Sequence, residues 1–371
     1  MTIAPIPAGQ PLRSPDPTKG VPPAAAAGGL TPAQIVATWR TDWAEHVPAG
    51  DPSDPARAAA AIADIQKLFA PANGGVKRAQ HAKALYTTTR AELRVPADLP
   101  AAVAHGPFAP GAKLRAIVRV SNVAGVGTSD EEADLRGIAI RLTDDQGHVQ
   151  DLLMNTSETF MAKGAKGAIV GAQVRGKGLG FLAKAVWRRE IGFFAAIELV
   201  MAGKRVMSRG VSLAGHTFWS RTPFQLGEHA VKLRLVPVES DPKLQANGPE
   251  QLSRDLERRL DGGVVRYKLQ VQGFRDPTST PLDDMRKAWD SPWLTVGELT
   301  LPWAKGAARQ EELAHEREVD GLAFGIGNRW GPEDGALKGI GELNAIREAA
   351  YQASADGRGV KDGKRCPFGF G

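Results

Sequence analysis

Cysteine is nearly absent from this 371-residue sequence, which contains only Cys366. A single cysteine excludes a disulfide framework and any cysteine-rich metal site. It also fits a reducing compartment. Long apolar runs are missing as well: no uninterrupted stretch of about 18 apolar residues occurs, so we expect no membrane span.

The first residues lack the basic start and apolar run of a signal peptide, and we therefore expect a cytoplasmic protein. The net charge of +6 favours anionic partners. No basic stripe lies on a known reading motif, so nucleic acid is not an expected partner. The glycine-rich run at 176–180 follows no clear strand and lacks an acidic partner, which argues against a nucleotide site.

Proline, alanine and glycine dominate residues 1–30, where we expect a flexible arm. Helices are predicted from Thr31, where Thr-Pro-Ala-Gln matches a capping box, and over Ala58–Phe69, 249–260 and Glu342–Ala355. Strands are predicted over Lys113–Ser121, Gly137–Leu142, Asp151–Met154, His229–Val238, Val264–Phe274 and Trp293–Leu301. This spacing is typical of an antiparallel barrel or sandwich with long insertions.

Three side chains share one face of the last predicted helix. Arg347, Tyr351 and Arg358 are spaced i, i+4 and i+11, within roughly 40° of one another. Neighbouring guanidinium groups favour the phenolate form of a tyrosine, and phenolate suits ferric iron. Because arginine and tyrosine also share ordinary solvated helix faces, this pattern alone leaves both interpretations open.

Several blocks of the sequence match one family in the right order. They are RAQHAK (78–83), residues 115–160, PFQLGEHAVKLRLVP (223–237), LTVGELTL (294–301), LAFGIGN (322–328) and R-x-x-x-Y-x-x-x-x-x-x-R (347–358). The second block keeps the family spacing of Arg119, Ser121, Asn155 and Phe160 without gaps. Over roughly residues 35–360 the sequence therefore resembles the catalase superfamily.

The resemblance implies an α+β fold, a catalase-like antiparallel β-barrel with flanking helices that enclose one haem. Residues 31–371 would form this haem-binding domain, as a homo-oligomer (dimer or tetramer). On the distal side of the haem, His81 would be the catalytic base and Asn155 the amide that orients peroxide. Ser121 would accept a hydrogen bond from His81 and fix its tautomer.

On the proximal side, the resemblance makes Tyr351 the axial iron ligand, with Arg347 holding it anionic. Arg78, Arg119 and Arg358 would pair with the haem propionates. Phe160 matches a distal-pocket phenylalanine that packs near the haem. No C-x-x-C-H motif for covalent attachment appears, so the expected cofactor is haem b.

The sequence departs from full catalases at several places. Gln80 precedes the distal histidine, where valine is usual and narrows the channel above the iron. Met154-Asn155-Thr156 replaces the usual G-N-N motif, and Gln352-Ala353 replaces Pro-Asp after the tyrosine. The sequence ends 20 residues after Tyr351, so we expect neither a C-terminal flavodoxin-like domain nor an NADPH site.

These departures resemble the shorter catalase-related proteins, which reduce or rearrange organic and lipid hydroperoxides. The leading hypothesis is therefore a haem peroxidase or hydroperoxide-transforming enzyme that uses hydrogen peroxide or organic hydroperoxides. The alternatives are a true catalase that dismutes hydrogen peroxide and a non-catalytic haem-binding protein. Retention of both His81 and Asn155 argues against the last, because a carrier needs only the proximal side.

Residues 166–209 interleave basic and apolar side chains. The basic ones are Lys166, Arg175, Lys177, Lys184, Arg188, Arg189, Lys204, Arg205 and Arg209, and the apolar ones include Phe181, Leu182, Trp187, Phe193 and Phe194. Such a segment could contact an anionic membrane peripherally and give access to lipid hydroperoxides. The alternative is an amphipathic helical insertion that packs on the barrel or on another subunit.

Overall fold

A computed structural model describes residues 29–71, 78–239, 241–302, 307–331 and 337–360. Most of the predicted N-terminal arm and Cys366 lie outside the described residues. Helix α1 (Pro32–Val36) begins at the predicted capping box. Thr31 Oγ1 accepts from the backbone N–H of Gln34 at 3.2 Å, and Gln34 Oε1 accepts from that of Thr31 at 2.8 Å.

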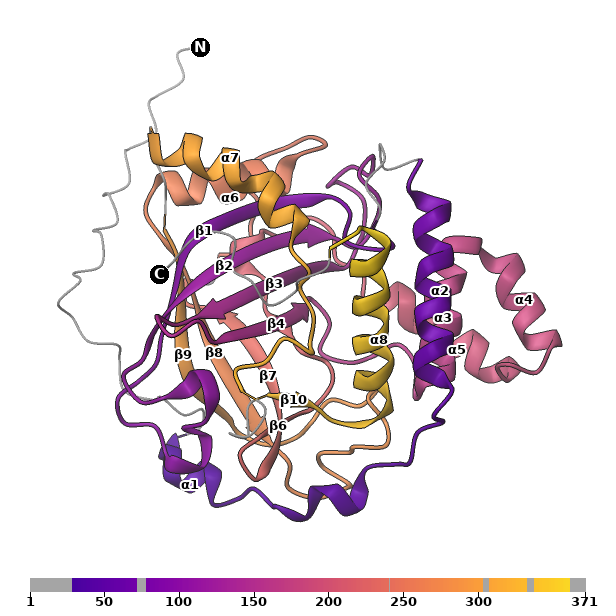
Figure 1. Cartoon of the computed structure of the whole chain (residues 1–371), viewed down its shortest axis with the longest axis horizontal. Helices are drawn as coiled ribbons and strands as arrows, with labels where there is room; N and C mark the ends of the chain where they lie inside the picture. Colours follow the sequence, from indigo (N-terminus) through magenta and orange to yellow (C-terminus); the bar gives the residue numbers. More distant parts are fainter. Residues whose placement is uncertain (1–28, 72–77, 240, 303–306, 332–336, 361–371) are drawn as a thin grey trace, which may run out of the picture.

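Eight antiparallel strands form a closed barrel (Figure 1), which confirms the predicted fold class. Around the ring they are β7 (His229–Pro237), β5 (Phe218–Trp219), β4 (Val149–Asn155), β3 (Arg136–Thr143), β2 (Lys113–Asn122), β1 (Ala84–Arg94), β9 (Trp293–Leu301) and β8 (Val265–Gly273). The pairing of β7 with β8 closes the ring, and closure removes the exposed edges of an open sheet. Two short strands, β6 (Phe224–Leu226) and β10 (Lys338–Gly339), extend the sheet beside β7.

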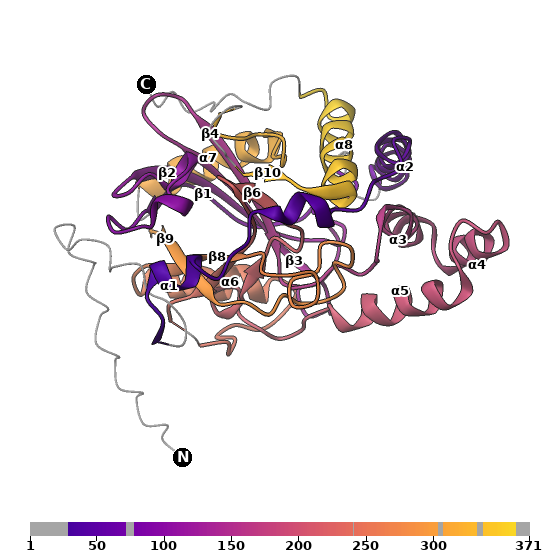
Figure 2. The same ribbon diagram turned by 90° about the horizontal axis from the view of Figure 1, so that it is seen from below.

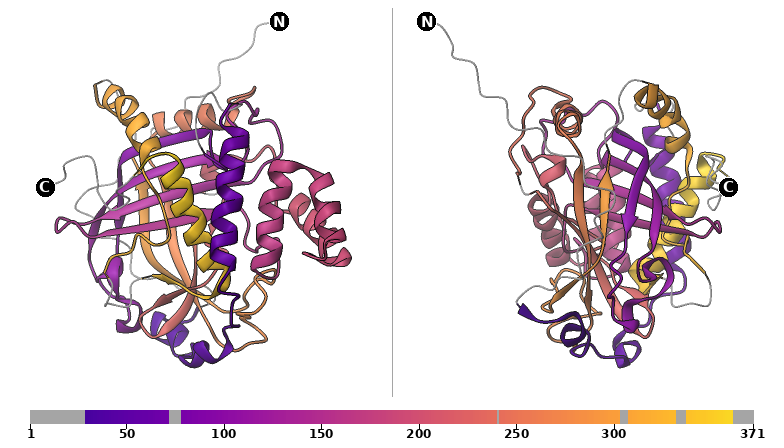
Figure 3. Two further views of the ribbon diagram at one scale, coloured as in Figure 1. Left: turned by 45° about the vertical axis from the view of Figure 1, so that its right-hand side comes forward. Right: turned by 90° about the vertical axis from the view of Figure 1, so that its left-hand side faces the viewer.

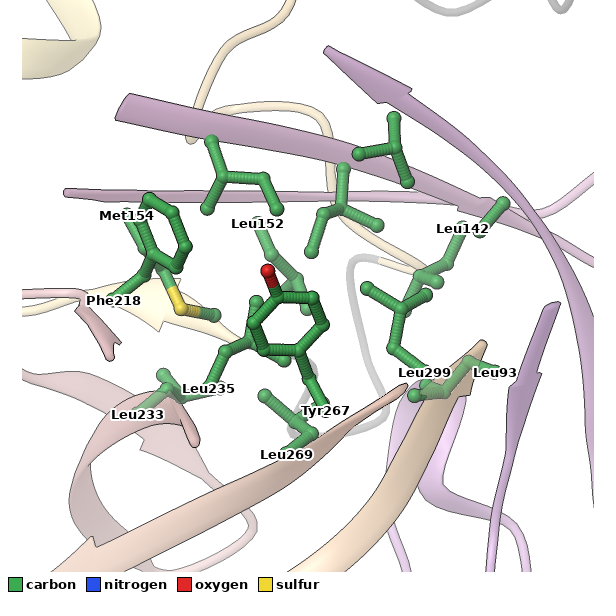
Figure 4. Packing of buried hydrophobic residues seen from close by; sticks show 14 of the residues in the cluster. Leu93, Leu142, Leu152, Met154, Phe218, Leu233, Leu235, Tyr267, Leu269 and Leu299 are labelled. Carbon is green, nitrogen blue, oxygen red and sulfur yellow. The ribbon is translucent and has the colours of Figure 1, made fainter. Parts of the chain in front are cut away.

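The barrel interior is a packed apolar core (Figure 4). Leu142, Leu235 and Leu299 are fully buried there, and Tyr267 is 2% exposed. The Tyr267 hydroxyl donates to the carbonyl of Leu213 at 2.9 Å, so its polar tip is satisfied in the interior. Since the barrel is filled with side chains, a ligand site has to lie outside it.

Helices cover one side of this barrel (Figure 1). Helix α8 (Gly341–Gly357) lies next to the strands, and α2 (Asp54–Phe69) packs along it, with the Gln66 side-chain amide donating to the carbonyl of Ser354 at 2.9 Å. Helices α3 (Ala165–Lys177), α4 (Leu179–Trp187) and α5 (Phe193–Arg205) follow beyond α2 and project from the body (Figures 2 and 3). Helices α6 (Gln251–Asp261) and α7 (Ala307–Gly321) lie at one end of the barrel (Figure 1).

All the predicted strands and helices are present, with bounds shifted by a few residues. Strands β1, β5, β6 and β10 and helix α7 were not predicted. In β1, the threonines Thr87 and Thr88 are buried, and register shifts interrupt its pairing with β2, so the sequence lacks an alternating apolar pattern. The run at 176–180 joins α3 to α4 and follows no strand, as expected.

A buried ion pair fixes the segment 322–328 against the barrel. Arg141 on β3 and Asp151 on β4 form a bidentate pair with both distances 2.8 Å, and neither side chain is exposed. Asp151 also accepts from the Asn328 side-chain amide at 2.7 Å and from the Gly325 backbone at 2.9 Å. These bonds hold the Phe324 ring at the edge of the candidate site, with its centre 5.2 Å from the Arg141 Cζ.

Candidate functional site

A cavity of about 650 Å³ lies between strands β2–β4 of the barrel and helices α2, α3, α5 and α8. This volume is within the range that small-molecule and cofactor sites occupy. All nine candidate side chains line it: Arg78, His81, Arg119, Ser121, Asn155, Phe160, Arg347, Tyr351 and Arg358. Side chains from four separate segments of the chain (78–81, 119–121, 155–160 and 347–358) are therefore brought to one place.

His81 adopts a constrained backbone conformation at the cavity wall. Its φ of 58° is in the left-handed region, which few residues other than glycine and asparagine adopt. The backbone N–H of His81 donates to the carbonyl of Val123 at 3.2 Å, and Nδ1 lies 2.9 Å from Ser121 Oγ. Ser121 is 3% exposed, so the partner of the imidazole is itself held rigidly.

The imidazole of His81 lies directly on strand β3. Ser121 on β2 pairs with Gly137 on β3, and Gly137 pairs with Asn155 on β4, so the three form one row across the sheet. A Cβ at position 137 would lie 2.4 Å from His81 Cε1 and 2.7 Å from Nδ1. Only glycine leaves room for the ring there. Gly137 was within a matched block but was not singled out, because its importance depends on strand register.

Asn155 ends β4 and is oriented by a local bond. Its Oδ1 accepts from the backbone N–H of Ser157 at 3.0 Å. That bond leaves the amide NH2 to donate into the cavity, in the same row as Ser121 and His81. The barrel therefore presents a hydroxyl, an imidazole and an amide donor side by side.

Tyr351 and Arg347 lie on α8 and face the cavity from the helical side. Tyr351 is half-buried against the main core, and a Cβ added at Gly325 would lie 3.7 Å from the Tyr351 Cβ. Arg347 donates to Thr222 Oγ1 and, at 3.0 Å, to Asn344 Oδ1. Its guanidinium is therefore anchored between α8 and the strand side, in the same cavity as the phenol.

Three arginines converge at one end of the cavity. Arg119 is 3% exposed and forms a 2.7 Å ion pair with Asp320, while Arg78 and Arg358 both donate to the Asp320 carbonyl. Burial and the charges of Arg119 and Arg358 lower the pKa of Arg78, and burial followed by Arg119 lowers that of Arg358. Three guanidiniums with one partly exposed carboxylate form a site that attracts anions.

Sequence reasoning missed Arg221, which also lines the cavity. Its φ is 66°, its guanidinium lies 4.2 Å from the Phe160 ring centre, and Nε donates to the Thr159 carbonyl at 3.0 Å. Nη2 is buried and makes no hydrogen bond with the described residues. Burial, and next the charge of Arg347, lower the pKa of Arg221 to about 9. No local pattern in the sequence marks this second cationic end of the cavity.

The chemistry of the cavity fits a haem. The arginines around Asp320 suit its two propionates, and an apolar lining that includes Leu153, Ile169 and Phe324 suits the porphyrin faces. Tyr351 offers an oxygen ligand from α8, and the row on β2–β4 faces it across the cavity. The absence of a Cβ at Gly137 supplies the space that the imidazole occupies beside β3.

Three solved structures with a similar fold are catalases. A fungal catalase matches with a TM-score of 0.57 at 16% identity, over 76% of this chain and 59% of that one. Catalase A from Saccharomyces cerevisiae matches with a TM-score of 0.56 at 15% identity, over 75% of this chain and 60% of that one. A bacterial catalase matches with a TM-score of 0.53 at 20% identity, over 75% of this chain and 56% of that one. The chain thus has a catalase-like fold and spans less than two thirds of each of these proteins. No protein-family model matches the sequence, nor does any curated protein.

Proposed function

We propose that this protein is a haem-dependent peroxidase or hydroperoxide-transforming enzyme, with haem b held between α8 and the barrel. Tyr351 is its iron ligand, and Arg78, Arg119 and Arg358 hold the propionates. The observation that carries the proposal is the row of Ser121, Gly137 and Asn155 with His81 on it, facing Tyr351 across one cavity. A protein that only carries haem has no need of that row.

The chain's own groups handle the proton. When Ser121 Oγ accepts the Nδ1 proton of His81, Nε2 carries the lone pair and serves as the base. Nε2 then takes a proton from one peroxide oxygen and returns it to the other, and the Asn155 amide hydrogen-bonds to the peroxide and orients it. When bound, the haem supplies the redox-active iron at which the peroxide O–O bond breaks.

Cavity shape favours substrates larger than hydrogen peroxide. Gln80 lines the cavity beside His81, and the lining continues past the site to Leu179, Leu199 and Met207. This apolar extension offers room for the organic part of a hydroperoxide. Dismutation of hydrogen peroxide, the competing function, would require only the small space beside His81 and Asn155.

Turnover assays separate these functions. The haem-loaded protein is given hydrogen peroxide or cumene hydroperoxide, and oxygen release is measured beside oxidation of a phenolic donor. We expect donor oxidation with cumene hydroperoxide and slow oxygen release. Vigorous oxygen release with negligible donor turnover would reverse the assignment to catalase.

A histidine variant tests the distal base. His81→Ala should lower turnover by about 10²–10⁴-fold with haem still bound, as expected for loss of a general base. His148→Ala is the matched control, because His148 is partly exposed on the turn between β3 and β4 and does not line the cavity. Equal turnover by the two variants would remove the role given to His81.

A further inference from the structure

Helices α4 and α5 carry an unusual number of exposed apolar side chains. Of ten large apolar side chains exposed on the described residues, six lie here: Leu179, Trp187, Phe193, Phe194, Ile197 and Met201. Trp187 is 81% and Phe194 is 83% exposed, and the rings of Phe193 and Phe194 contact each other with centres 5.7 Å apart. Large exposed apolar side chains gathered on two neighbouring helices are typical of an interaction site.

The apolar side chains follow the outer side of each helix. On α5, Phe193, Ile197 and Met201 recur every four residues, which forms one stripe, while Ala196 and Leu199 are buried on the other side. Phe181 and Leu182, in contrast, are partly or fully buried and belong to the packing of the helices. Figures 2 and 3 show α4 and α5 projecting away from the barrel, so the stripe is accessible.

Positive charge is concentrated on the same segment. The chain has 47 basic and 41 acidic residues, of which nine and two lie within 166–209. The rest of the chain therefore has a net charge of −1, and the whole positive excess belongs to this segment. Lys184, Arg188, Arg189 and Arg205 are exposed on α4, on α5 or in the turn between them. Exposed aromatic rings can enter the bilayer interface, and basic side chains beside them can bind anionic headgroups.

We propose that α4 and α5 (residues 179–205, which we name the docking hairpin) seat the protein on an anionic lipid bilayer. The aromatic side chains enter the interface, and the basic ones contact the headgroups. A second copy of this chain fits less well, since the docking hairpin has five basic and two acidic residues and two such hairpins would repel each other. None of the helices that the structure describes has the length and apolar character needed to span a membrane.

The docking hairpin also connects the bilayer to the cavity. Leu179 of α4 and Leu199, Val200 and Gly203 of α5 line the cavity, so α5 has one side toward the cavity and the other toward the lipid. Hydroperoxides of membrane acyl chains are therefore the substrate class that reaches the site. This second step depends on the function proposed above, whereas the docking itself does not.

Vesicle co-sedimentation tests the docking. We expect binding to vesicles of phosphatidylcholine mixed with phosphatidylglycerol at low salt, and at least tenfold weaker binding to pure phosphatidylcholine or at high salt. The triple variant Trp187→Ser, Phe193→Ser, Phe194→Ser should bind at least tenfold more weakly. Leu313→Ser, at an exposed apolar position on α7, is the matched control and should bind like the unmodified protein.

Two outcomes overturn the docking. One is no binding of the unmodified protein to anionic vesicles at low salt. The other is self-association, seen by sedimentation velocity, that the triple variant abolishes while vesicle binding is unchanged. Because all three replaced residues are exposed, the triple variant should keep the melting temperature of the unmodified protein, which excludes unfolding as the cause of a loss.

The substrate is tested with one peroxide in solution and one in the bilayer. The triple variant should turn over cumene hydroperoxide normally but lose at least tenfold activity on phospholipid hydroperoxides in anionic vesicles. Equal activity of variant and unmodified protein on the vesicles overturns the substrate class. Absence of turnover with both peroxides would instead contradict the proposed function and leave the vesicle-binding result standing.

Discussion

The imidazole of His81 lies so close to the backbone of Gly137 that a Cβ there would be 2.4 Å from Cε1. Gly137 pairs with Ser121 on one side and with Asn155 on the other. The position of the proposed base is thus determined by a residue without a side chain, through the register of three strands.

Gly137→Ala should displace the imidazole and separate Nδ1 from Ser121 Oγ. Because a misplacement of about 1 Å can cost about 10²-fold in rate, we expect a loss of that size in peroxide turnover. Haem binding, followed by the Soret absorbance, should persist. Gly127→Ala is the control, since nothing lies within 4 Å of a Cβ there. Normal turnover by Gly137→Ala would mean that the ring does not act from this position.

Tyr351→Phe should abolish the phenolate-type absorption spectrum and weaken haem retention on a desalting column, because phenylalanine cannot coordinate iron. Tyr86→Phe removes the same hydroxyl from a buried tyrosine on β1 outside the cavity and should leave the spectrum unchanged. An unaltered spectrum in Tyr351→Phe would show that another residue ligates the iron.

Asp320→Asn should destabilise the haem-free protein more than the haem-loaded one. The carboxylate offsets the positive charge of Arg78, Arg119 and Arg358. Because it is partly exposed, we expect its loss to lower the free energy of unfolding by only about 1–2 kcal/mol. Haem propionates should restore the lost stability, since a ligand that binds the folded state stabilises it. Calorimetry with and without haem measures both values. Asp145→Asn is the exposed control, and an equal loss with and without haem would contradict the role of the arginines.

Lys232 should make stability depend on pH. Its ammonium is buried 4.9 Å from the Trp289 ring centre, and burial lowers its pKa to about 7. Between that value and the ordinary 10.5 the unfolded chain binds more protons, so stability should rise with pH in this window. Relative to Lys232→Met, the unmodified protein should gain stability between about pH 6 and about pH 9 in denaturant titrations. Lys268→Met is the control, and a difference constant with pH would contradict the shift.

Much of the fold was predictable because most strands and helices have clear periodicity. Strand β1 was not predictable, because its buried side chains include Thr87 and Thr88. Threonine is polar, so the sequence does not show that these two positions belong to the barrel core. The resemblance to catalases predicted a fold that the structure confirms. Helix α7 was missed because its exposed and buried positions differ little in polarity.

The candidate site was predictable where a motif names a side chain and its spacing. Nine such side chains do line one cavity, although their roles stay predictions. Gly137 and Arg221 were beyond reach for a physical reason: one matters through cross-strand register and the other through a positive φ and a contact with Phe160. Neither property is encoded in neighbouring residues.

The packing of α2 on α8 has a consequence for folding. The bond between His81 and Ser121 joins residues 40 apart, whereas that between Gln66 and Ser354 spans 288. Closing the longer loop costs more entropy, and distant contacts generally form late. The row on β2–β4 should therefore assemble before α8 docks. At that stage a nascent chain would have the side of the cavity that the barrel forms, but not the side that α8 and Tyr351 form. Cofactor capture would then be the last event of maturation, after the C-terminal helix is in place.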